Sequence, residues 1–471
     1  MKNYCDYFCG KKITVMGLGV LGRGVNVAKF LAECGAELTV TDLKNGEELK
    51  LSLTKLAKFK NIKYVLGNHR LEDFKDKDFI IKAGSAPFNS PYIEEARKNG
   101  IAIEMDESLF VKLATEIITV GVTGTKGKSI TTRLIFEILK SQKNILGKKR
   151  NVFLGGNVKG QATLPLLKKV KLGDIVVMEL DSWRLQGFHD SKISSHISVF
   201  TSFMPDHLNY YNNDIKQYFY DKANIFKYQT KDDFLILGGQ FLKAIKKFGL
   251  YDSFQSFKKE IKSKIILSSK KNIPKNWKIK ILGVHNLENI AAAISACENL
   301  GIKKLEIKKI AENFRGEPGR LEFLKEIKGV KFYNDTTATI PESAIAALNA
   351  FQNYKSKIIL IGGGADKELD YKEYAKTVKK YVKTLILFQG AASDKIIKEL
   401  KIKKNDLGGK NSKTIFFSGI KSMKEAFNLA ISYAEKGDIV LLSPGSASFG
   451  VFKNEFDRGE QFNKIIKRLK I

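Results

Sequence analysis

Residues 118–133 read ITVGVTGTKGKSITTR, and the rest of the fold can be built outward from this stretch. Residues 118–122 are rich in β-branched side chains, which is typical of a buried strand. The run ends at Gly124, and an apolar helical pattern follows as far as Leu139. The intervening GTKGKS is therefore predicted to be a glycine-bearing loop between a strand and a helix.

A loop of this kind suits phosphate, because its backbone N–H groups turn inward at the N-terminus of a helix. Lys128 can reach the terminal phosphates of a nucleotide, and the Ser129 hydroxyl can ligate Mg²⁺. A chance glycine loop is the alternative, but the strand and helix on its flanks argue against it. The sequence therefore predicts an ATP–Mg²⁺ site that includes Gly124, Thr125, Lys126, Gly127, Lys128 and Ser129.

The length of the chain predicts more than one domain. Its 471 residues exceed the limit of about 250–300 residues for a single hydrophobic core, and 43% of them are hydrophobic. No run of 18 or more apolar residues is present, which argues against a membrane-spanning helix. The opening MKNYCDYFCGKK has no apolar segment of the kind that secretory signals contain, so we expect a cytoplasmic protein.

The charge of the chain is strongly positive, with 81 Lys and Arg against 50 Asp and Glu, a net +31. Such an excess can indicate nucleic-acid binding. The lysines, however, are spread over the whole length, and no nucleic-acid motif is recognised. A solvated lysine-rich surface that attracts anionic small molecules explains the charge better. The four cysteines are scattered without a zinc-ligand pattern, so we expect reduced thiols.

Three α/β blocks follow one another, over residues 1–113, 114–313 and 314–471. The first opens with a strand at Ile13–Met16, then GLGVLG at 17–22, a helix, and a strand that ends at Asp42. Further strands are expected at Phe79–Lys82 and Ile101–Ile103. This pattern is typical of a nucleotide-binding βαβ unit. On the residues alone, the unit could bind a dinucleotide or a sugar nucleotide, or be purely structural.

The other two blocks alternate apolar strands with amphipathic helices. The predicted strands are 174–180, 196–203 and 234–238 in the second block, and 330–333, 357–362, 384–388, 414–417 and 438–442 in the third. This alternation indicates mostly parallel sheets covered on both faces. The predicted fold is α/β with three domains: an N-terminal Rossmann-like domain, a central P-loop-type domain with a mostly parallel sheet, and a C-terminal Rossmann-like domain.

Polar groups end several predicted strands of the second block. Glu179 follows DIVVM, as a metal-binding carboxylate does in this class of fold, and Asp206-His207 follows ISVFTSF. In parallel sheets such positions gather beside the phosphate loop. Asn286 and Asn289 in GVHNLEN lie on one face of a helix, where they could contact adenine or simply cap the helix. For His207 alone, a structural role is an equal alternative.

Taken together, these motifs resemble those of the Mur ligases, ATP-dependent amide-forming enzymes of peptidoglycan precursor synthesis. The ordered series runs over essentially the whole chain: GLG, TGTKGKS, GGN, ELDS, DHL, YDK, GVHNLEN, GR, NDTTAT, GGGADK and SPGSAS. Within the family, the GLG start, the length and the last two segments are most similar to the members that add D-glutamate.

The resemblance implies a set of residue roles, carried over by position. For the UDP-linked substrate it implies Gly17, Leu18, Gly19, Gly22, Asp42, Lys44, Gly84, Ser85 and Asn157. For ATP it adds Asn286, Asn289, Arg320 and Asp335 to the phosphate loop. For metal it implies Ser129, Glu179, His207 and Lys222, the last as an N-carbamate. For the incoming amino acid it implies Thr339, Lys367 and Ser448. Lys128, Glu179, His207 and Lys222 would be the catalytic set.

Several positions depart from the family pattern. Asp181 stands where a serine is usual and Arg184 where a glutamine is usual. Gly319, Thr337 and Glu455 likewise replace a histidine, a lysine and an aromatic residue. These changes leave the phosphate and metal residues intact and bear mainly on which amino acid is used.

The implied reaction joins D-glutamate to UDP-N-acetylmuramoyl-L-alanine through an acyl phosphate, with ATP and two Mg²⁺ ions. The resemblance implies these two small-molecule substrates as partners, without nucleic acid or membrane, for a monomeric enzyme. Three alternatives stay open: a related ligase for another amino acid or acceptor, a nucleic-acid-stimulated P-loop ATPase, and a relative that binds ATP without catalysis.

Overall fold

The computed structural model describes residues 4–84, 86–87, 89–158, 160–208, 210–354, 357–402 and 414–469. In this part of the chain, three sheets follow the order of the three predicted blocks. The chain divides into two compact units, Met1–Trp277 with Glu288–Ala311 and Lys278–Leu287 with Glu312–Ile471. The first unit contains the first two sheets, and the second unit contains the third. Domain boundaries near 113 and 313 stay predictions.

The first sheet is parallel, in the order β3-β2-β1-β4-β5. Its strands are β1 (Lys12–Met16), β2 (Glu37–Asp42), β3 (Ile62–Leu66), β4 (Phe79–Lys82) and β5 (Ala102–Glu104). The associated helices are α1 (Tyr4–Phe8), α2 (Arg23–Glu33), α3 (Lys50–Thr54), η1 (Leu71–Phe74) and α4 (Pro91–Lys98). The helix α5 (Asp106–Leu113) follows β5 and packs against helices of the second sheet. Val15 packs in the core with α2, and its neighbour Met16 packs in the opposite core with α4. Burial on both faces explains the unbroken apolar strands.

The second sheet is also parallel, in the order β11-β10-β9-β6-β8-β7. Its strands are β6 (Ile118–Thr123), β7 (Val152–Gly156), β8 (Ile175–Glu179), β9 (Ile197–Phe200), β10 (Phe234–Gly238) and β11 (Lys264–Ser268). The helices are α6 (Lys128–Lys140), η2 (Leu164–Lys168), α7 (Ser182–Asp190), α8 (Ile215–Ala223), α9 (Phe241–Lys247), α10 (Tyr251–Glu260), η3 (Lys270–Asn272), α11 (Val284–Asn299) and α12 (Lys304–Asn313).

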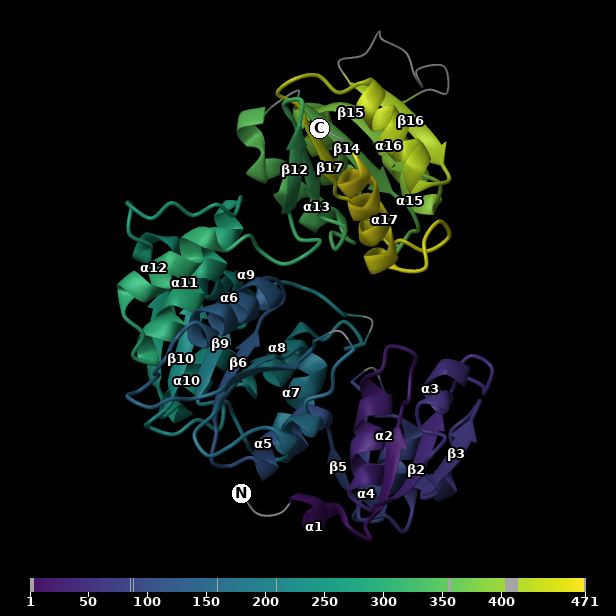
Figure 1. The fold of residues 1–471 in the computed structure, drawn as a ribbon, viewed down its shortest axis with the longest axis vertical. Helices are drawn as coiled ribbons and strands as arrows, with labels where there is room; N and C mark the ends of the chain where they lie inside the picture. Colours follow the sequence, from purple (N-terminus) through teal and green to yellow (C-terminus); the bar gives the residue numbers. More distant parts are fainter. Residues whose placement is uncertain are drawn as a thin grey trace. The chain divides into compact units, whose positions relative to one another are not determined.

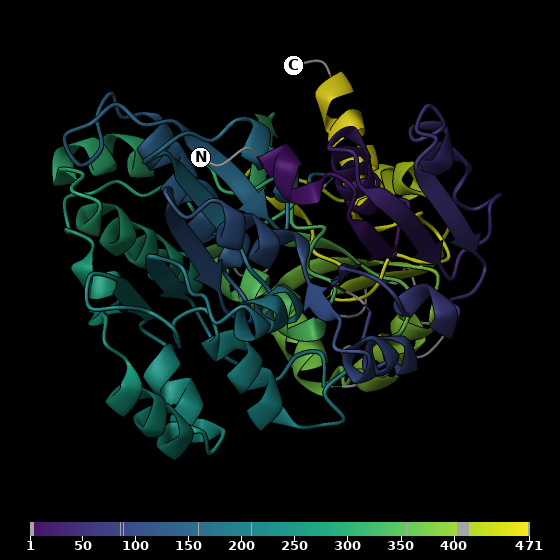
Figure 2. The same cartoon turned by 90° about the horizontal axis from the view of Figure 1, so that it is seen from below.

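The position of β6 decides where this sheet can bind a ligand. β6 lies between β8 and β9, and the strand order reverses there, so the loop after β6 opens at a topological switch point. The helix α6 packs against β6, β7 and β8. Figures 1 and 2 show helices along both faces of this sheet.

The third sheet is mixed, in the order β12-β13-β17-β14-β15-β16, with only β12 and β13 antiparallel among the described pairs. Its strands are β12 (Glu322–Ile327), β13 (Val330–Asn334), β14 (Ile358–Gly363), β15 (Val382–Phe388), β16 (Ile415–Ile420) and β17 (Ile439–Leu442). The helices are α13 (Pro341–Ala350), η4 (Gln352–Tyr354), α14 (Lys372–Tyr381), α15 (Ala391–Leu400), α16 (Met423–Ser432) and α17 (Glu455–Arg468). Leu360 faces the core of α13 to α15, and Ile361 faces that of α16 and α17.

The predicted fold class is confirmed: α/β, with two parallel sheets and a third that is mostly parallel. Four strands were not predicted, namely β3, β7, β11 and β12. All four are edge strands, and β11 and β12 carry charged residues within or beside short apolar runs. An edge strand is covered on fewer sides and needs fewer apolar residues, so its sequence signal is weak. In the described residues, no helix is both long enough and apolar enough to cross a membrane.

Candidate active site

The predicted phosphate loop lies between β6 and α6, and two of its positions accept only glycine. Gly124 and Gly127 have φ angles of 139° and 90°, in the range that side chains rarely adopt. A Cβ atom on Gly124 would lie 2.1 Å from Thr201 Oγ1, and one on Gly127 would lie 2.1 Å from Asn289 Oδ1. The backbone can therefore curl tightly at the start of α6, as a phosphate cradle requires.

Hydroxyl groups at the end of β9 hold this loop in place. Ser202 Oγ accepts from the Lys126 N–H at 3.0 Å and donates to the Lys126 carbonyl at 2.9 Å. Thr201 Oγ1 donates to the same carbonyl at 2.6 Å. Neither residue carries a motif that assigns it a role from the sequence. Their position after the strand that pairs with β6 is the signal that could have identified them.

Two lysines meet at the loop from different helices. Lys128 Nζ, on α6, donates to the carbonyls of Gly124 and Thr125 at 3.0 Å each. Lys222 Nζ, on α8, donates to the same Gly124 carbonyl at 3.0 Å and is fully buried. Burial and the nearby Lys128 ammonium hold the pKa of Lys222 well below its usual value. The structure therefore brings two predicted catalytic residues, far apart in sequence, to one atom.

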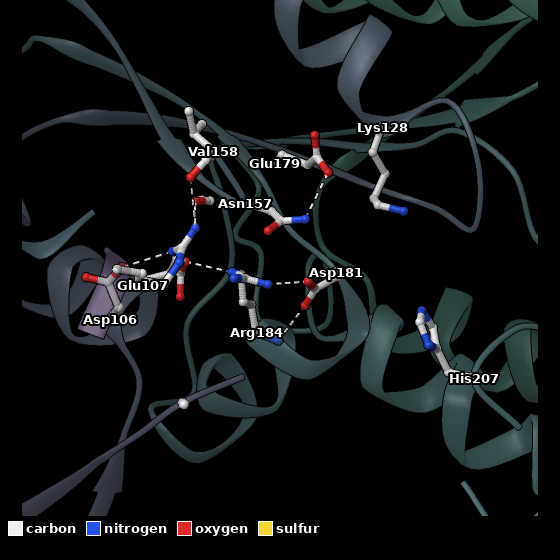
Figure 3. A network of polar contacts seen from close by, with 12 residues as sticks. Asp106, Glu107, Lys128, Asn157, Val158, Glu179, Asp181, Arg184 and His207 are labelled. Atoms are coloured by element: carbon white, nitrogen blue, oxygen red, sulfur yellow. Dashed lines mark hydrogen bonds and ion pairs between the residues drawn. The ribbon is translucent and has the colours of Figure 1, made fainter. Parts of the chain in front are cut away.

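Glu179 ends β8 at the carboxyl edge of the sheet, as predicted. Its carboxylate accepts from Asn157 Nδ2 at 3.4 Å, and the Asn157 N–H donates to the Glu179 carbonyl at 2.7 Å. The neighbouring Gly156 permits this approach, because a Cβ atom there would lie 2.1 Å from the Glu179 carbonyl oxygen. The predicted metal ligand and the predicted GGN segment are thus in direct contact (Figure 3).

His207 is a half-exposed residue with a left-handed backbone, at φ 54°. Its ring lies against the indole of Trp183, with centroids 4.7 Å apart. Burial lowers its pKa, assisted by Lys222 and Lys128 and opposed by Asp206. Neutral imidazole is the form that ligates metals, so this environment is compatible with the predicted role.

The donor chemistry fits Mg²⁺ only in part. Ser129 lies in the first turn of α6, and Ser129 and Glu179 offer the oxygen ligands that Mg²⁺ prefers. In the described ranges, however, no group of three or more His, Cys, Asp or Glu residues is arranged to hold a metal ion. Phosphate oxygens and water would therefore have to complete the coordination shell.

The two asparagines of α11 differ in surroundings. Asn289 lies against both α6 and the phosphate loop: its backbone carbonyl accepts from Thr131 Oγ1 of α6 at 3.4 Å, and its side chain lies beside Gly127. Asn286 is buried, and its Nδ2 donates to the Leu282 carbonyl at 2.7 Å. Whether Asn286 contacts adenine or only supports the start of α11 stays a prediction.

The glycine loop of the first sheet follows β1. Gly17, Gly19 and Gly22 all have positive φ, and Gly22 is the N-cap of α2. Asp42 organises this loop, because its two carboxylate oxygens accept from the N–H groups of Gly19 at 2.8 Å and Lys44 at 2.9 Å.

The other predicted members of this site are placed as follows. Leu18 is buried. Gly84 follows β4 beside the Arg184 guanidinium, which would lie 3.7 Å from a Cβ atom there. Ser85 lies outside the described residues.

The predicted residues of the third sheet lie around the carboxyl ends of β13, β14 and β17. Asp335 is buried and accepts from Ser443 Oγ at 2.7 Å and from the Leu321 N–H at 3.1 Å. Burial raises its pKa to about 7, against the effect of the Ser443 hydrogen bond.

The residues predicted for the amino acid are partly brought together. Lys367 Nζ donates to Thr339 Oγ1 at 3.3 Å, and Ser448 is buried in the loop after β17. Arg320 is half-buried just before β12 and interacts electrostatically with Asp335.

A buried ionic network, which was not predicted from the sequence, joins the two sheets of the first unit (Figure 3). Arg23, at the start of α2, donates to the carbonyl of Gly156 at 2.6 Å and pairs with Asp106 and Glu107. Glu107 also accepts from Arg184, which pairs with Asp181. Only Asp181–Arg184 is local, three residues apart at the start of α7; the other pairs join three separate segments, so no pattern in the sequence signals them.

Two family models match the chain: the Mur ligase middle domain over residues 122–297, and the glutamate ligase domain of the Mur ligases over residues 319–445. Among curated proteins, the UDP-N-acetylmuramoylalanine–D-glutamate ligase of Roseiflexus is 35% identical, over 97% of this chain and 98% of its own. The enzyme of the same name from Borreliella burgdorferi is 36% identical, over 97% of each chain.

Solved structures show the same fold. The UDP-N-acetylmuramate–alanine ligase of Thermotoga maritima matches with a TM-score of 0.59 and 20% identity, over 98% of this chain and all of that one. The MurF ligase of Thermotoga maritima, solved in complex with ADP, matches with a TM-score of 0.57 and 17% identity, over 99% and 97%.

Proposed function

The chain belongs to the Mur ligase family, and from this premise we propose that it joins D-glutamate to UDP-N-acetylmuramoyl-L-alanine at the expense of ATP. One observation carries the proposal above the others. The likeness to D-glutamate ligases extends over 97% of the chain, including the phosphate loop with its two glycines and Lys128.

The reaction has two steps. The alanyl carboxylate of the sugar nucleotide attacks the γ-phosphorus of ATP, and ADP leaves that phosphorus, which gives an acyl phosphate. The amine of D-glutamate then attacks the acyl carbon, and phosphate leaves from the tetrahedral intermediate. When bound, Mg²⁺ supplies positive charge that offsets the repulsion between the carboxylate and the triphosphate.

The described residues support separate roles in these steps. The N–H groups of residues 124–129 and the Lys128 ammonium hold the triphosphate. Ser129, Glu179 and His207 are the proposed metal ligands. Asn289 lies beside the loop for contact with the nucleotide, and Gly17 to Gly22, Asp42 and Asn157 border the sugar nucleotide. Thr339, Lys367 and Ser448 receive the amino acid, with Arg320 and Asp335 near the nucleotide.

Lys222 is proposed to act as an N-carbamate. Its neutral amine would add to CO₂ with release of a proton, which gives a carbamate anion that could help hold a second Mg²⁺. The lowered pKa of Lys222 supports this role, because only the unprotonated amine is nucleophilic. We also propose that the protein is cytoplasmic and monomeric.

Phosphate release tests the function directly. The purified protein receives UDP-N-acetylmuramoyl-L-alanine and MgATP with D-glutamate, L-glutamate or D-aspartate in separate reactions. We expect release with D-glutamate and a ligated product by mass spectrometry. Release with another amino acid alone would favour the related-ligase alternative, to which the departure at Glu455 points. ATP binding without release under all conditions would indicate a non-catalytic relative.

A further inference from the structure

The helix α2 belongs to the first sheet, but two side chains of its first turns bind a loop of the second sheet. Arg23 Nη2 donates to the Gly156 carbonyl at 2.6 Å and to the Val158 carbonyl at 3.3 Å. Three residues later, Asn26 Nδ2 donates to the Gly160 carbonyl at 3.0 Å. Alternate carbonyls at the end of β7 and in the loop that follows therefore accept hydrogen bonds from one face of α2.

The other side of the same guanidinium is held by two carboxylates of α5. Arg23 Nη1 lies 3.1 Å from Asp106 Oδ2 and 2.5 Å from Glu107 Oε1, and both acids are buried. Asp106 also accepts from the N–H groups of Thr163 at 2.8 Å and Leu164 at 2.7 Å. The loop between β7 and η2, residues 157–163, is thus bound by Arg23 at its start and by Asp106 at its end.

This β7–η2 loop begins with a residue that the proposed function places beside the sugar nucleotide. The N–H of that residue, Asn157, donates to the Glu179 carbonyl at 2.7 Å. On the other side, Arg23 directly follows Gly22, the N-cap of α2 and the last glycine of the loop that borders the same substrate. A Cβ atom on Gly22 would lie 3.6 Å from the Gly160 carbonyl oxygen, so the two loops lie close together. Arg23 therefore lies where the two halves of the proposed sugar-nucleotide site meet.

We propose that Arg23 is a positioning residue for the sugar nucleotide: it fixes the β7–η2 loop against the glycine loop, so that Asn157 and residues 17–22 face one substrate together. A guanidinium suits this role because its planar fork can bind carboxylates through one nitrogen and carbonyls through the other. Arg23 acts through the loop and does not touch the substrate. The inference rests on the proposed function in one respect, that Asn157 and the glycine loop border the sugar nucleotide.

The test measures each ligand separately, by calorimetric titration with UDP-N-acetylmuramoyl-L-alanine alone or with MgATP alone, so that no turnover occurs. R23K keeps a positive charge beside Asp106 and Glu107, but its single ammonium group cannot bind the loop carbonyls at the same time. We expect the Kd for the sugar nucleotide to rise about tenfold in R23K, because the loop is misplaced. The Kd for MgATP should stay within about twofold of the wild type. A merely structural role would weaken the binding of both ligands alike.

A double variant shows whether Arg23 acts through the loop. N157A alone should weaken binding of the sugar nucleotide, because it removes the side chain that the loop presents. If Arg23 serves to place that side chain, R23K/N157A should bind within about twofold of N157A. Effects of the two substitutions that simply add would mean that Arg23 contacts the substrate itself, and would overturn the positioning role.

Amide hydrogen exchange of the protein without ligands reports on the loop directly. Residues 157–164 should exchange faster in R23K than in the wild type, because the hydrogen bonds from α2 to the loop carbonyls are lost. The matched control is R150K. Arg150 also binds two backbone carbonyls, those of Ile145 and Gly173, but it precedes β7 and so lies at the other end of that strand. R150K should leave both the affinity for the sugar nucleotide and the exchange of residues 157–164 unchanged.

A second variant keeps the test decisive if R23K does not fold, which thermal melting shows. Asn26 makes an exposed contact to the Gly160 carbonyl, so N26A should fold and raise the Kd for the sugar nucleotide about threefold. The inference is overturned if R23K, or N26A where R23K is unfolded, binds the sugar nucleotide like the wild type. Failure of the proposed function looks different: the wild type itself would not bind the sugar nucleotide, while exchange of the loop would still respond to these variants.

Discussion

At the scale of single residues, the active site depends on side chains whose charge is altered by their surroundings. Lys128 and Lys222 share one carbonyl acceptor, and burial of the second lowers its pKa. Lys128 could be assigned from sequence because its motif is local. The burial of Lys222 could not, since it depends on how α8 packs against α7 and beside the phosphate loop.

Replacement of Lys128 by alanine should abolish ligation. The ammonium group is the charged contact to the triphosphate, so we expect kcat to fall by at least about a hundredfold. Phosphate release in the presence of both substrates measures the loss. Near-normal turnover in this variant would contradict the assignment of Lys128 to the triphosphate site.

Replacement of Lys222 by alanine should inactivate the enzyme in a way that small carboxylic acids partly reverse. A short carboxylate can occupy the space of the missing carbamate and restore its negative charge. Activity is measured with and without added formate or acetate. The matched control is Lys216→Ala, which removes an exposed lysine from the same helix. Unchanged activity in Lys222→Ala would exclude the carbamate role.

Asp335 should make the stability of the second unit depend on pH. Its pKa of about 7 exceeds the value of about 3.9 in an unfolded chain, so the folded state retains a proton that the unfolded state loses. This contribution to the unfolding free energy is full below about pH 4, falls as the pH rises to about 7, and is lost above it.

The variant Asp335→Asn tests this dependence, since the amide resembles the protonated acid. Between pH 4 and 7, the wild type should lose a few kcal/mol relative to the variant. Urea unfolding at several pH values measures the difference. Ser443→Ala removes the hydrogen bond that favours the carboxylate and should shift the dependence to higher pH. Parallel pH profiles for wild type and Asp335→Asn would contradict the assignment.

At the scale of elements, the loop between β6 and α6 keeps its conformation because side chains of neighbouring elements pack tightly against it. Thr201 and Ser202 from the end of β9 hold its backbone, and Asn289 from α11 closes over Gly127. The strand–loop–helix order could be predicted from the sequence. The hydrogen bonds that hold the loop could not be predicted, because they join segments more than 70 residues apart.

Gly127→Ala tests this fit. The new Cβ atom would overlap the Asn289 side chain, so either the loop or Asn289 must move, and the Kd for MgATP should rise about tenfold or more. Gly249→Ala is the matched control, with φ also positive and no atom within 4 Å of the added carbon. Both variants should melt earlier, because each stores about 1–2 kcal/mol of backbone strain. Equal MgATP affinity in the two variants would contradict close packing of Asn289 against the phosphate loop.

At the scale of the whole molecule, the net charge of +31 needs no nucleic-acid partner to explain it. Many of the lysines are exposed and several form surface ion pairs, for example with Glu373 and Glu460. Such a surface raises the local concentration of anionic substrates. This attraction is screened at physiological salt, where charges interact over only about 8 Å.

The protein should therefore bind duplex DNA or RNA only at low ionic strength. Fluorescence anisotropy with a labelled oligonucleotide, titrated from about 0.02 to 0.15 M salt, measures the effect. We expect binding to vanish at the upper concentration and ATP hydrolysis to be unaffected by nucleic acid. Nucleic-acid binding that persists at the upper salt concentration and stimulates ATP hydrolysis would favour the alternative of a nucleic-acid-stimulated ATPase.

The sequence by itself determined the three α/β blocks, the phosphate loop, the strand-end carboxylate at Glu179 and the family, because each depends on neighbouring residues or on motifs in a fixed order. Only the tertiary structure decided that Lys222 meets Lys128 at Gly124, that Asp42 binds the glycine loop, and that Glu107 pairs with both Arg23 and Arg184. These contacts join residues from separate elements, and their strength comes from burial. Burial is a property of the packed chain, so no local pattern in the sequence records it.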